Sequence, residues 1–266
     1  MPPCGPLSDA HGSRKLKFDE PVKTYAMSLL QYIRALFLLI IALPITIMFS
    51  LLTLIDIMFV RKSETKVQIF PRSWGKTICR IADVGVRIIG AENLAPAQTY
   101  IFIGNHVSQF DIFSVQGYFP YDFRWIAKKE LFRIPFFGKA MLRSGIVPID
   151  RSHGREALKS LNRAAEQIAG GTSVLIFPEG TRSLDGKLHP FKTGAIILAI
   201  KAGVPVVPIA FIGTYGILPK GKLLANSGEI VIRIGTPIST THYKPKDRQK
   251  LAEHLHDKVA ELLEQK

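Results

Sequence analysis

The segment from Ala35 to Ile55 restricts the possible folds of this chain more than any other part of the sequence. Its 21 residues, ALFLLIIALPITIMFSLLTLI, include no charged side chain, and Arg34 and Asp56 flank it. A helix of this length is about 30 Å long, which matches the hydrocarbon core of a bilayer. The segment lies too far from the N-terminus for a cleavable signal peptide, and it is long for a buried core helix. We therefore expect a membrane-embedded helical segment.

The topology of this segment stays open at the level of sequence. Pro44 removes one backbone hydrogen bond near its middle, so either one spanning helix or two short helices that enter a single leaflet would fit. Basic residues flank both sides, with five Lys or Arg in residues 1–34 and six in residues 61–80, and this balance does not choose an orientation. Residues 72–83 read equally well as a short interfacial helix or as an ordinary packed helix.

Strand-like and helix-like patterns alternate after this segment. Helices are expected over Arg155–Ala169, Thr193–Ala202 and Asp247–Glu264, where apolar residues recur at helical spacing. The expected strands are VRIIG, YIFIG, FRWIA, GIVPI, SVLIF, VPVVPIAFI and EIVIRIG. This alternation is typical of an α/β fold in which a largely parallel sheet is flanked by helices. We divide the chain into a flexible tail (1–27), a membrane-associated helical segment (28–84) and an α/β domain (85–266).

Two polar stretches follow predicted strands directly, where sites collect in α/β domains. The first, NHVSQFD, contains Asn105, His106, Ser108 and Asp111. Ser108 and Asp111 have the spacing of a helix start, and capping alone would explain both. It would leave His106 unexplained. If the chain turns back, Asp111 can fix the tautomer of the His106 ring and leave its other nitrogen free as a base.

The second stretch, PEGTRS, follows SVLIF and offers groups that bind anions. Backbone N–H groups of Gly180 and Thr181 could face an anion, and the guanidinium of Arg182 can bind phosphate at two points. Glu179 could hold Arg182 in position or accept a hydrogen bond from a substrate hydroxyl. A plain solvated turn is the alternative interpretation of this stretch.

The two stretches together resemble the HxxxxD and EGTR motifs of the glycerolipid acyltransferases, in the same order. WIAKKELFRIPFFGKAMLRSGIVPIDR (125–151) and VPVVPIAFIG (204–213) resemble two further blocks of that family. The resemblance covers residues 100–213 and is strongest to 1-acylglycerol-3-phosphate (lysophosphatidic acid) acyltransferases of bacterial type. It shows no departure within the HxxxxD and EGTR motifs.

The resemblance implies a role for each matching residue. His106 would be the general base that deprotonates the acceptor hydroxyl, and Asp111 would orient it. Lys128 would stabilise the oxyanion. Asn105 and Ser108 would support the histidine loop. The acceptor phosphate would be bound by Glu179, Gly180, Thr181, Arg182 and Arg151.

The resemblance also implies the partners and the location. The expected substrates are lysophosphatidic acid and an acyl thioester, either acyl-CoA or acyl-ACP, with no other cofactor and no metal. The net charge of +14 favours such anionic partners and a phospholipid surface. The expected location is a membrane, the bacterial inner membrane, with the catalytic domain on its cytoplasmic side.

Other function classes are less consistent with the sequence. Most of the other histidines lack an acidic or histidine partner at ligand spacing, and His254 and His256 lie on a predicted polar helix face. A serine hydrolase would need a G-x-S-x-G elbow, which is missing. GILPKGKL (216–223) approaches a phosphate-binding loop, but Leu223 replaces the Ser or Thr that binds magnesium, so we interpret it as a basic loop. Nucleic-acid binding rests on charge alone. The remaining alternatives are acylation of another lysophospholipid or lyso-aminolipid, and a non-catalytic lipid-binding module.

Overall fold

The computed structural model describes residues 29–60, 68–134, 137–150 and 154–265. The predicted tail (1–27) and Arg151 lie outside these residues. The helices are α1 (Leu29–Ile55), α2 (Ile69–Ile81), α3 (Phe110–Tyr118), α4 (Phe137–Arg143), α5 (Arg155–Ala169), α6 (Thr193–Ala202), α7 (Thr214–Ile217) and α8 (Arg248–Glu264). The strands are β1 (Val84–Ile89), β2 (Ile101–Gly104), β3 (Arg124–Lys128), β4 (Val147–Ile149), β5 (Val174–Ile176), β6 (Val206–Ile212) and β7 (Gly228–Ile234).

The seven strands form one sheet in the order β1-β7-β6-β2-β5-β3-β4. Each predicted strand is present with bounds within two residues of the prediction, and the mostly parallel α/β fold is confirmed. Strands β6, β2, β5, β3 and β4 run parallel to one another. The pair β7 and β1 is parallel within itself, but β7 is antiparallel to β6.

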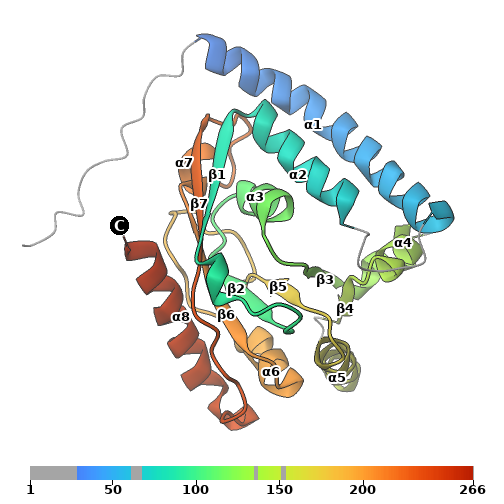
Figure 1. Cartoon of the computed structure of the whole chain (residues 1–266), viewed down its shortest axis with the longest axis vertical. Coiled ribbons are helices and arrows are strands. Elements are labelled where there is room, and N and C mark those ends of the chain that lie inside the picture. The colour runs from blue at the N-terminus through green and yellow to red at the C-terminus, as the bar shows by residue number, and fades with distance from the viewer. Residues whose placement is uncertain (1–28, 61–67, 135–136, 151–153, 266) are drawn as a thin grey trace, which may run out of the picture.

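Helices cover both faces of the sheet (Figure 1). On one face, α2 and α3 pack on the sheet and α1 lies outside them; α5, α6 and α8 cover the other face. Strand β2 shows how the sequence serves both layers. Phe102 contributes to the core under α2 and α3, whereas Ile101 and Ile103 contribute to the core under α5, α6 and α8. A central strand buried on both faces needs a continuous apolar run, and YIFIG supplies one.

The long apolar segment forms one continuous helix. Pro44 lies inside α1, and the helix continues through it rather than breaking into two. In the described part of the chain, α1 is the helix with the length and hydropathy to cross a membrane. Its outer side exposes large apolar side chains, among them Leu36, Ile40 and Leu43.

Helix α1 is fixed to the rest of the molecule along its length (Figure 1). The Gln31 side chain donates a hydrogen bond to Ser227 Oγ (3.1 Å), and Arg34 forms an ion pair with Asp83. Further along the helix, Trp74 Nε1 in α2 donates to Thr46 Oγ1 (3.0 Å). The outer surface of α1 is therefore a lateral apolar face of a compact body rather than a helix that projects from it.

Helix α2 is packed on both sides. Arg72 in its first turns donates to the carbonyl oxygens of Phe119 (2.8 Å) and Tyr121 (3.2 Å), so this side chain faces the domain. Gly75 of α2 and Gly117 of α3 face each other across the helix crossing. A Cβ at Gly75 would lie 2.6 Å from the backbone nitrogen of Gly117, so only glycine permits this approach of the two backbones.

Candidate active site

The two predicted motifs meet because they follow neighbouring strands. Strands β2 and β5 pair in parallel, and His106 and Glu179 follow their carboxyl ends. Asn105 fixes the first loop, since its side chain donates to the carbonyl of Phe211 in β6 (3.0 Å) and accepts from the N–H of the same residue (2.8 Å). The carboxyl edge of three central strands thus holds the start of the histidine loop.

His106 and Asp111 form a hydrogen-bonded pair in which the imidazole Nδ1 lies 2.9 Å from Asp111 Oδ2. The same oxygen accepts the backbone N–H groups of Val107 (2.8 Å) and Ser108 (2.9 Å). Asp111 is fully buried. Because a carboxylate oxygen accepts all three bonds, the Nδ1 of His106 is the protonated nitrogen and Nε2 carries the lone pair.

The lone pair on Nε2 is available for chemistry. Within the described residues, Nε2 makes no hydrogen bond, and the His106 side chain is 13% exposed. The imidazole stacks on the ring of Phe177 with centroids 4.0 Å apart and an interplanar angle of 10°. The ring is therefore held on one face and at one edge, which leaves Nε2 as a positioned base.

Glu179 joins the two motifs through the backbone of His106. Glu179 Oε1 accepts the N–H of His106 (2.7 Å), and Oε2 accepts the N–H of His189 (3.3 Å). In return, the carbonyl of His106 accepts the N–H of Ser183 (2.8 Å). Burial raises the pKa of the Glu179 carboxyl, and the two N–H bonds oppose this shift.

The contacts of Glu179 in the structure are with the backbone rather than with Arg182. Both of its oxygens meet backbone N–H groups, and among the described residues it forms no ion pair with Arg182. Arg182 is half-buried, and Gly180 and Thr181 are exposed beside it. Gly180 has a φ of +77°, a conformation that favours glycine.

The other predicted site residues are Ser108, Lys128 and Arg151, and each has a different position relative to the candidate site. Ser108 is buried, and its Oγ accepts the N–H of Phe110 (3.1 Å) and donates to the carbonyl of Leu218 (2.8 Å). Its side chain therefore holds the turn before α3, which begins after Gln109 as N-cap. Lys128 is exposed at the carboxyl end of β3, two strands away from β2. Arg151 lies outside the described residues.

The sequence reasoning missed two lysines and a second His–Asp pair near the loop from Glu179 to Arg182. Lys220 Nζ donates to Thr181 Oγ1 (3.1 Å) and to the carbonyl of Arg182 (3.0 Å). Lys192 lies against Gly180, where an added Cβ would come within 2.8 Å of its Nζ. His189 Nε2 lies 2.9 Å from Asp185 Oδ1, a spacing of four residues that the sequence showed.

Comparison with known proteins places this site in a family. Residues 85–212 match the family model described as Acyltransferase, a range that includes His106, Asp111 and the segment from Glu179 to Arg182. We call residues 85–212 the acyltransferase domain, after the family model that they match.

Relatives with named activities resemble the acyltransferase domain. The protein named 1-acyl-sn-glycerol-3-phosphate acyltransferase BAT2, chloroplastic, of Brassica napus is 42% identical over 153 residues, 57% of this chain and 44% of the relative. The 1-acyl-sn-glycerol-3-phosphate acyltransferase of Saccharomyces cerevisiae is 37% identical over 183 residues, 68% of this chain and 60% of the relative. The chain thus spans about half the length of these curated relatives.

A solved structure extends the similarity beyond the acyltransferase domain. The crystal structure of the 1-acyl-sn-glycerophosphate (LPA) acyltransferase PlsC from Thermotoga maritima matches with a TM-score of 0.69 and 28% identity. The match covers 87% of this chain and 97% of that chain. It therefore includes helical segments that lie outside the domain match.

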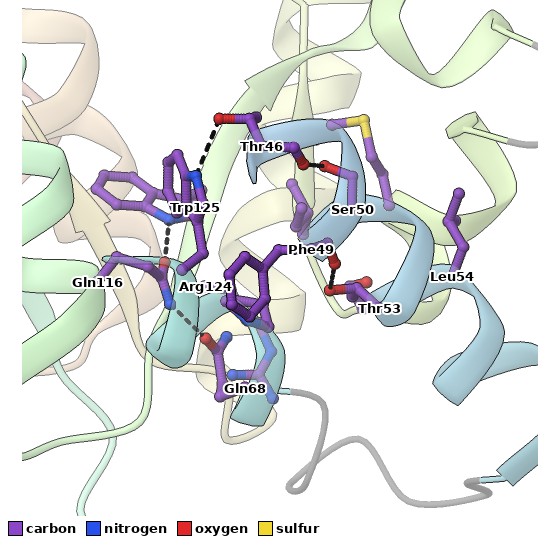
Figure 2. A pocket seen from close by; sticks show the side chains of 14 residues that line it. Thr46, Phe49, Ser50, Thr53, Leu54, Gln68, Gln116, Arg124 and Trp125 are labelled. Carbon is purple, nitrogen blue, oxygen red and sulfur yellow. Dashed lines mark hydrogen bonds between the residues drawn. The ribbon is translucent and has the colours of Figure 1, made fainter. Parts of the chain in front are cut away.

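A mostly apolar pocket lies between α1 and the acyltransferase domain (Figure 2). Its volume is about 240 Å³, and its walls come from α1, α2, α3, β3 and the α4 region. Residues of α1 that line it include Thr46, Phe49 and Thr53. Trp125, which also lines it, packs near Phe177 with ring centroids 6.1 Å apart. Ring contacts through Trp125 and Phe177 thus connect the wall of this pocket to His106.

Proposed function

We propose that this protein transfers a fatty acyl chain from a thioester to the free sn-2 hydroxyl of 1-acylglycerol-3-phosphate, giving phosphatidic acid. The observation that carries the proposal is the oriented His106, which lies beside a cationic loop on the same edge of the sheet. The names of the relatives support the choice of acceptor.

In the proposed reaction, Nε2 of His106 takes the proton of the acceptor hydroxyl. The hydroxyl oxygen then attacks the thioester carbonyl and forms a tetrahedral intermediate. This intermediate collapses as the carbon–sulfur bond breaks, and the leaving thiolate takes the proton from His106. The products are an ester and a free thiol, and no acyl-enzyme is needed. Asp111 stabilises the imidazolium that exists between the two proton transfers.

The acceptor phosphate binds at the loop from Gly180 to Arg182 in this proposal. Arg182 supplies a planar fork for phosphate oxygens, and the loop follows a strand end as anion-binding loops commonly do. Fixing the phosphate decides which hydroxyl reaches Nε2, which is catalysis by positioning. Lys128 as oxyanion donor and Arg151 as a further phosphate ligand are part of the proposal.

The membrane side of the molecule supplies the lipid. We propose that the outer face of α1 lies in a membrane and that one acyl chain occupies the pocket behind it. The pocket is mostly apolar and is lined by α1. The donor is acyl-CoA or acyl-ACP, and the location is a bacterial inner membrane with the domain on the cytoplasmic side. The strongly positive net charge supports association with anionic lipid and an anionic donor.

The full chain, purified in mixed micelles, would test this function with a panel of lysolipids and both donor types, and mass spectrometry would identify each product. We expect phosphatidic acid from 1-acylglycerol-3-phosphate. The variant His106→Ala should lose the activity, and His242→Ala, at an exposed histidine outside the site, should keep it. Acylation of a different lysolipid alone would overturn the acceptor assignment, and full activity of His106→Ala would overturn the general base.

A further inference from the structure

The segment after β6 contacts both halves of the candidate site, although the sequence indicated nothing more than a basic loop. Ser108 in the histidine loop donates through Oγ to the carbonyl of Leu218 (2.8 Å), and Ser108 forms an isolated antiparallel bridge with Pro219. Tyr215 in α7 donates through its hydroxyl to the carbonyl of Leu184, beyond the EGTR motif (3.0 Å). The segment therefore connects two loops that lie far apart in the sequence.

Lys220 is the residue of this segment that reaches the proposed phosphate loop. Its ammonium donates to Thr181 Oγ1 and to the backbone carbonyl of Arg182. Both acceptors are neutral oxygens. In the described ranges of the chain, no carboxylate lies within ion-pair distance of Lys220, so its charge is not compensated by a neighbour.

Lys220 and Thr181 each keep a proton that can be donated to a bound anion. An ammonium group has three N–H donors, and two of those of Lys220 are used. The hydroxyl of Thr181 accepts from Lys220, so its own proton is free to point to another acceptor. The ammonium of Lys220 also contacts the backbone carbonyl of Arg182. The guanidinium of Arg182 is the group that we propose to bind the same anion.

We propose that Lys220 is a second cation of the acceptor phosphate site and that it positions the loop carrying Arg182. The proposal rests on the proposed function, because it assigns the phosphate of that acceptor to this loop. It extends the site beyond the EGTR motif to a residue that follows α7.

The test compares Lys220→Met with Lys222→Met in the full chain. The two changes remove the same charge from the same segment, but Lys222 is exposed, and among the described residues its side chain makes no hydrogen bond or ion pair with either motif. We expect Lys220→Met to raise the KM for 1-acylglycerol-3-phosphate about tenfold or more, because a charge-assisted hydrogen bond to phosphate is lost. The KM for the thioester donor should stay unchanged, and Lys220→Arg should recover most of the affinity.

Several results would overturn the proposal. If Lys220→Met and Lys222→Met had the same acceptor KM, whether raised or unchanged, Lys220 would have no specific role in binding the acceptor phosphate. If Lys220→Met lowered kcat and Tm but left the acceptor KM unchanged, Lys220 would stabilise the fold without binding the phosphate. Both results require a wild-type enzyme that acylates lysophosphatidic acid. A wild type that fails to do so would overturn the proposed function itself, which keeps the two failures apart.

Discussion

At the scale of single residues, the position of one imidazole depends on four other residues, which come from two loops of the chain. Asp111 binds its edge, Phe177 stacks on its face, and Glu179 and Ser183 bind its backbone. A general base needs such restraint because proton transfer depends steeply on geometry. Catalytic loss is therefore expected from changes that leave His106 itself intact.

Asp111→Asn tests the orientation of the histidine. The amide offers one acceptor oxygen and brings a donor, so it cannot fix the Nδ1–H tautomer as the carboxylate does. We expect kcat to fall about 10²- to 10⁴-fold, the range typical of general base catalysis, with little change in acceptor KM. Steady-state kinetics would measure both. Asp257→Asn, at an exposed carboxyl beside His256, is the matched control, and an equal loss there would contradict the assignment.

Glu179→Gln tests the buried carboxyl through the dependence of stability on pH. The pKa of Glu179 is raised in the folded protein, so the folded state binds its proton more tightly than the unfolded state does. This contribution to stability is fully present below the unfolded pKa, and it is lost as pH rises through the folded pKa. We expect the Tm of the wild type, relative to that of Glu179→Gln, to fall across this window and then to level off. Parallel curves at all pH values would contradict this expectation.

At the scale of secondary-structure elements, the contact between α2 and α3 helps to fix the N-terminal helices α1 and α2 to the α/β domain. The close approach at Gly75 and Gly117 leaves no room for a side chain. Because α1 packs on α2, this crossing also sets where α1 lies relative to the sheet (Figure 1). The two glycines thus contribute to the attachment of α1 to the α/β domain, together with the direct contacts of Gln31 and Arg34.

Gly75→Ala should lower the free energy of unfolding by about 1–3 kcal/mol, as expected for overpacking. Gly194→Ala is the control, since Gly194 lies in α6 with open space around its Cβ position. There alanine should stabilise by up to about 1 kcal/mol through helix propensity. Thermal unfolding in detergent would measure both variants. A neutral effect of Gly75→Ala would contradict the close packing of α2 and α3.

The outer face of α1 makes a separate prediction about membrane binding. Ile40 and Leu43 are two-thirds exposed, so lysines there would place charge in lipid and leave the fold intact. We expect Ile40→Lys combined with Leu43→Lys to weaken flotation with phospholipid vesicles strongly. Leu158→Lys, at an exposed leucine on α5 across the sheet, should float as the wild type does. Equal flotation of the double variant would place the membrane contact elsewhere.

At the scale of the whole molecule, the pocket of Figure 2 lies at the junction between the apolar helix α1 and the α/β domain. A larger side chain in this pocket should shorten the preferred acyl chain. We expect Thr53→Phe to lower kcat/KM for long chains more than for short ones, and competition assays with mixed donors or acceptors would measure the ratio. Met48→Phe, on the exposed side of α1, is the control. An unchanged preference in Thr53→Phe would remove the pocket from the proposal.

Local patterns were sufficient to predict the strands, three helices and the meeting of the two motifs. Each of these follows from a continuous run of residues, and parallel neighbours bring their carboxyl ends to one edge. The contacts of Glu179 and Lys220 could not be predicted in this way. They join residues 73 and 38 positions apart, and such pairings depend on how the loops fold over the sheet. The reversed direction of β7 against β6 likewise depends on the connection after α7.

The pairing of β1 with β7 has a consequence for the order in which the protein is made. Strand β1 directly follows the helical hairpin of α1 and α2, yet its partner in the sheet is the last strand of the chain. During synthesis, the apolar helix α1 therefore leaves the ribosome long before β1 can pair. Lipid or a chaperone can bind α1 in that interval. If α1 binds lipid as proposed, the nascent chain can reach the membrane before its α/β domain has closed.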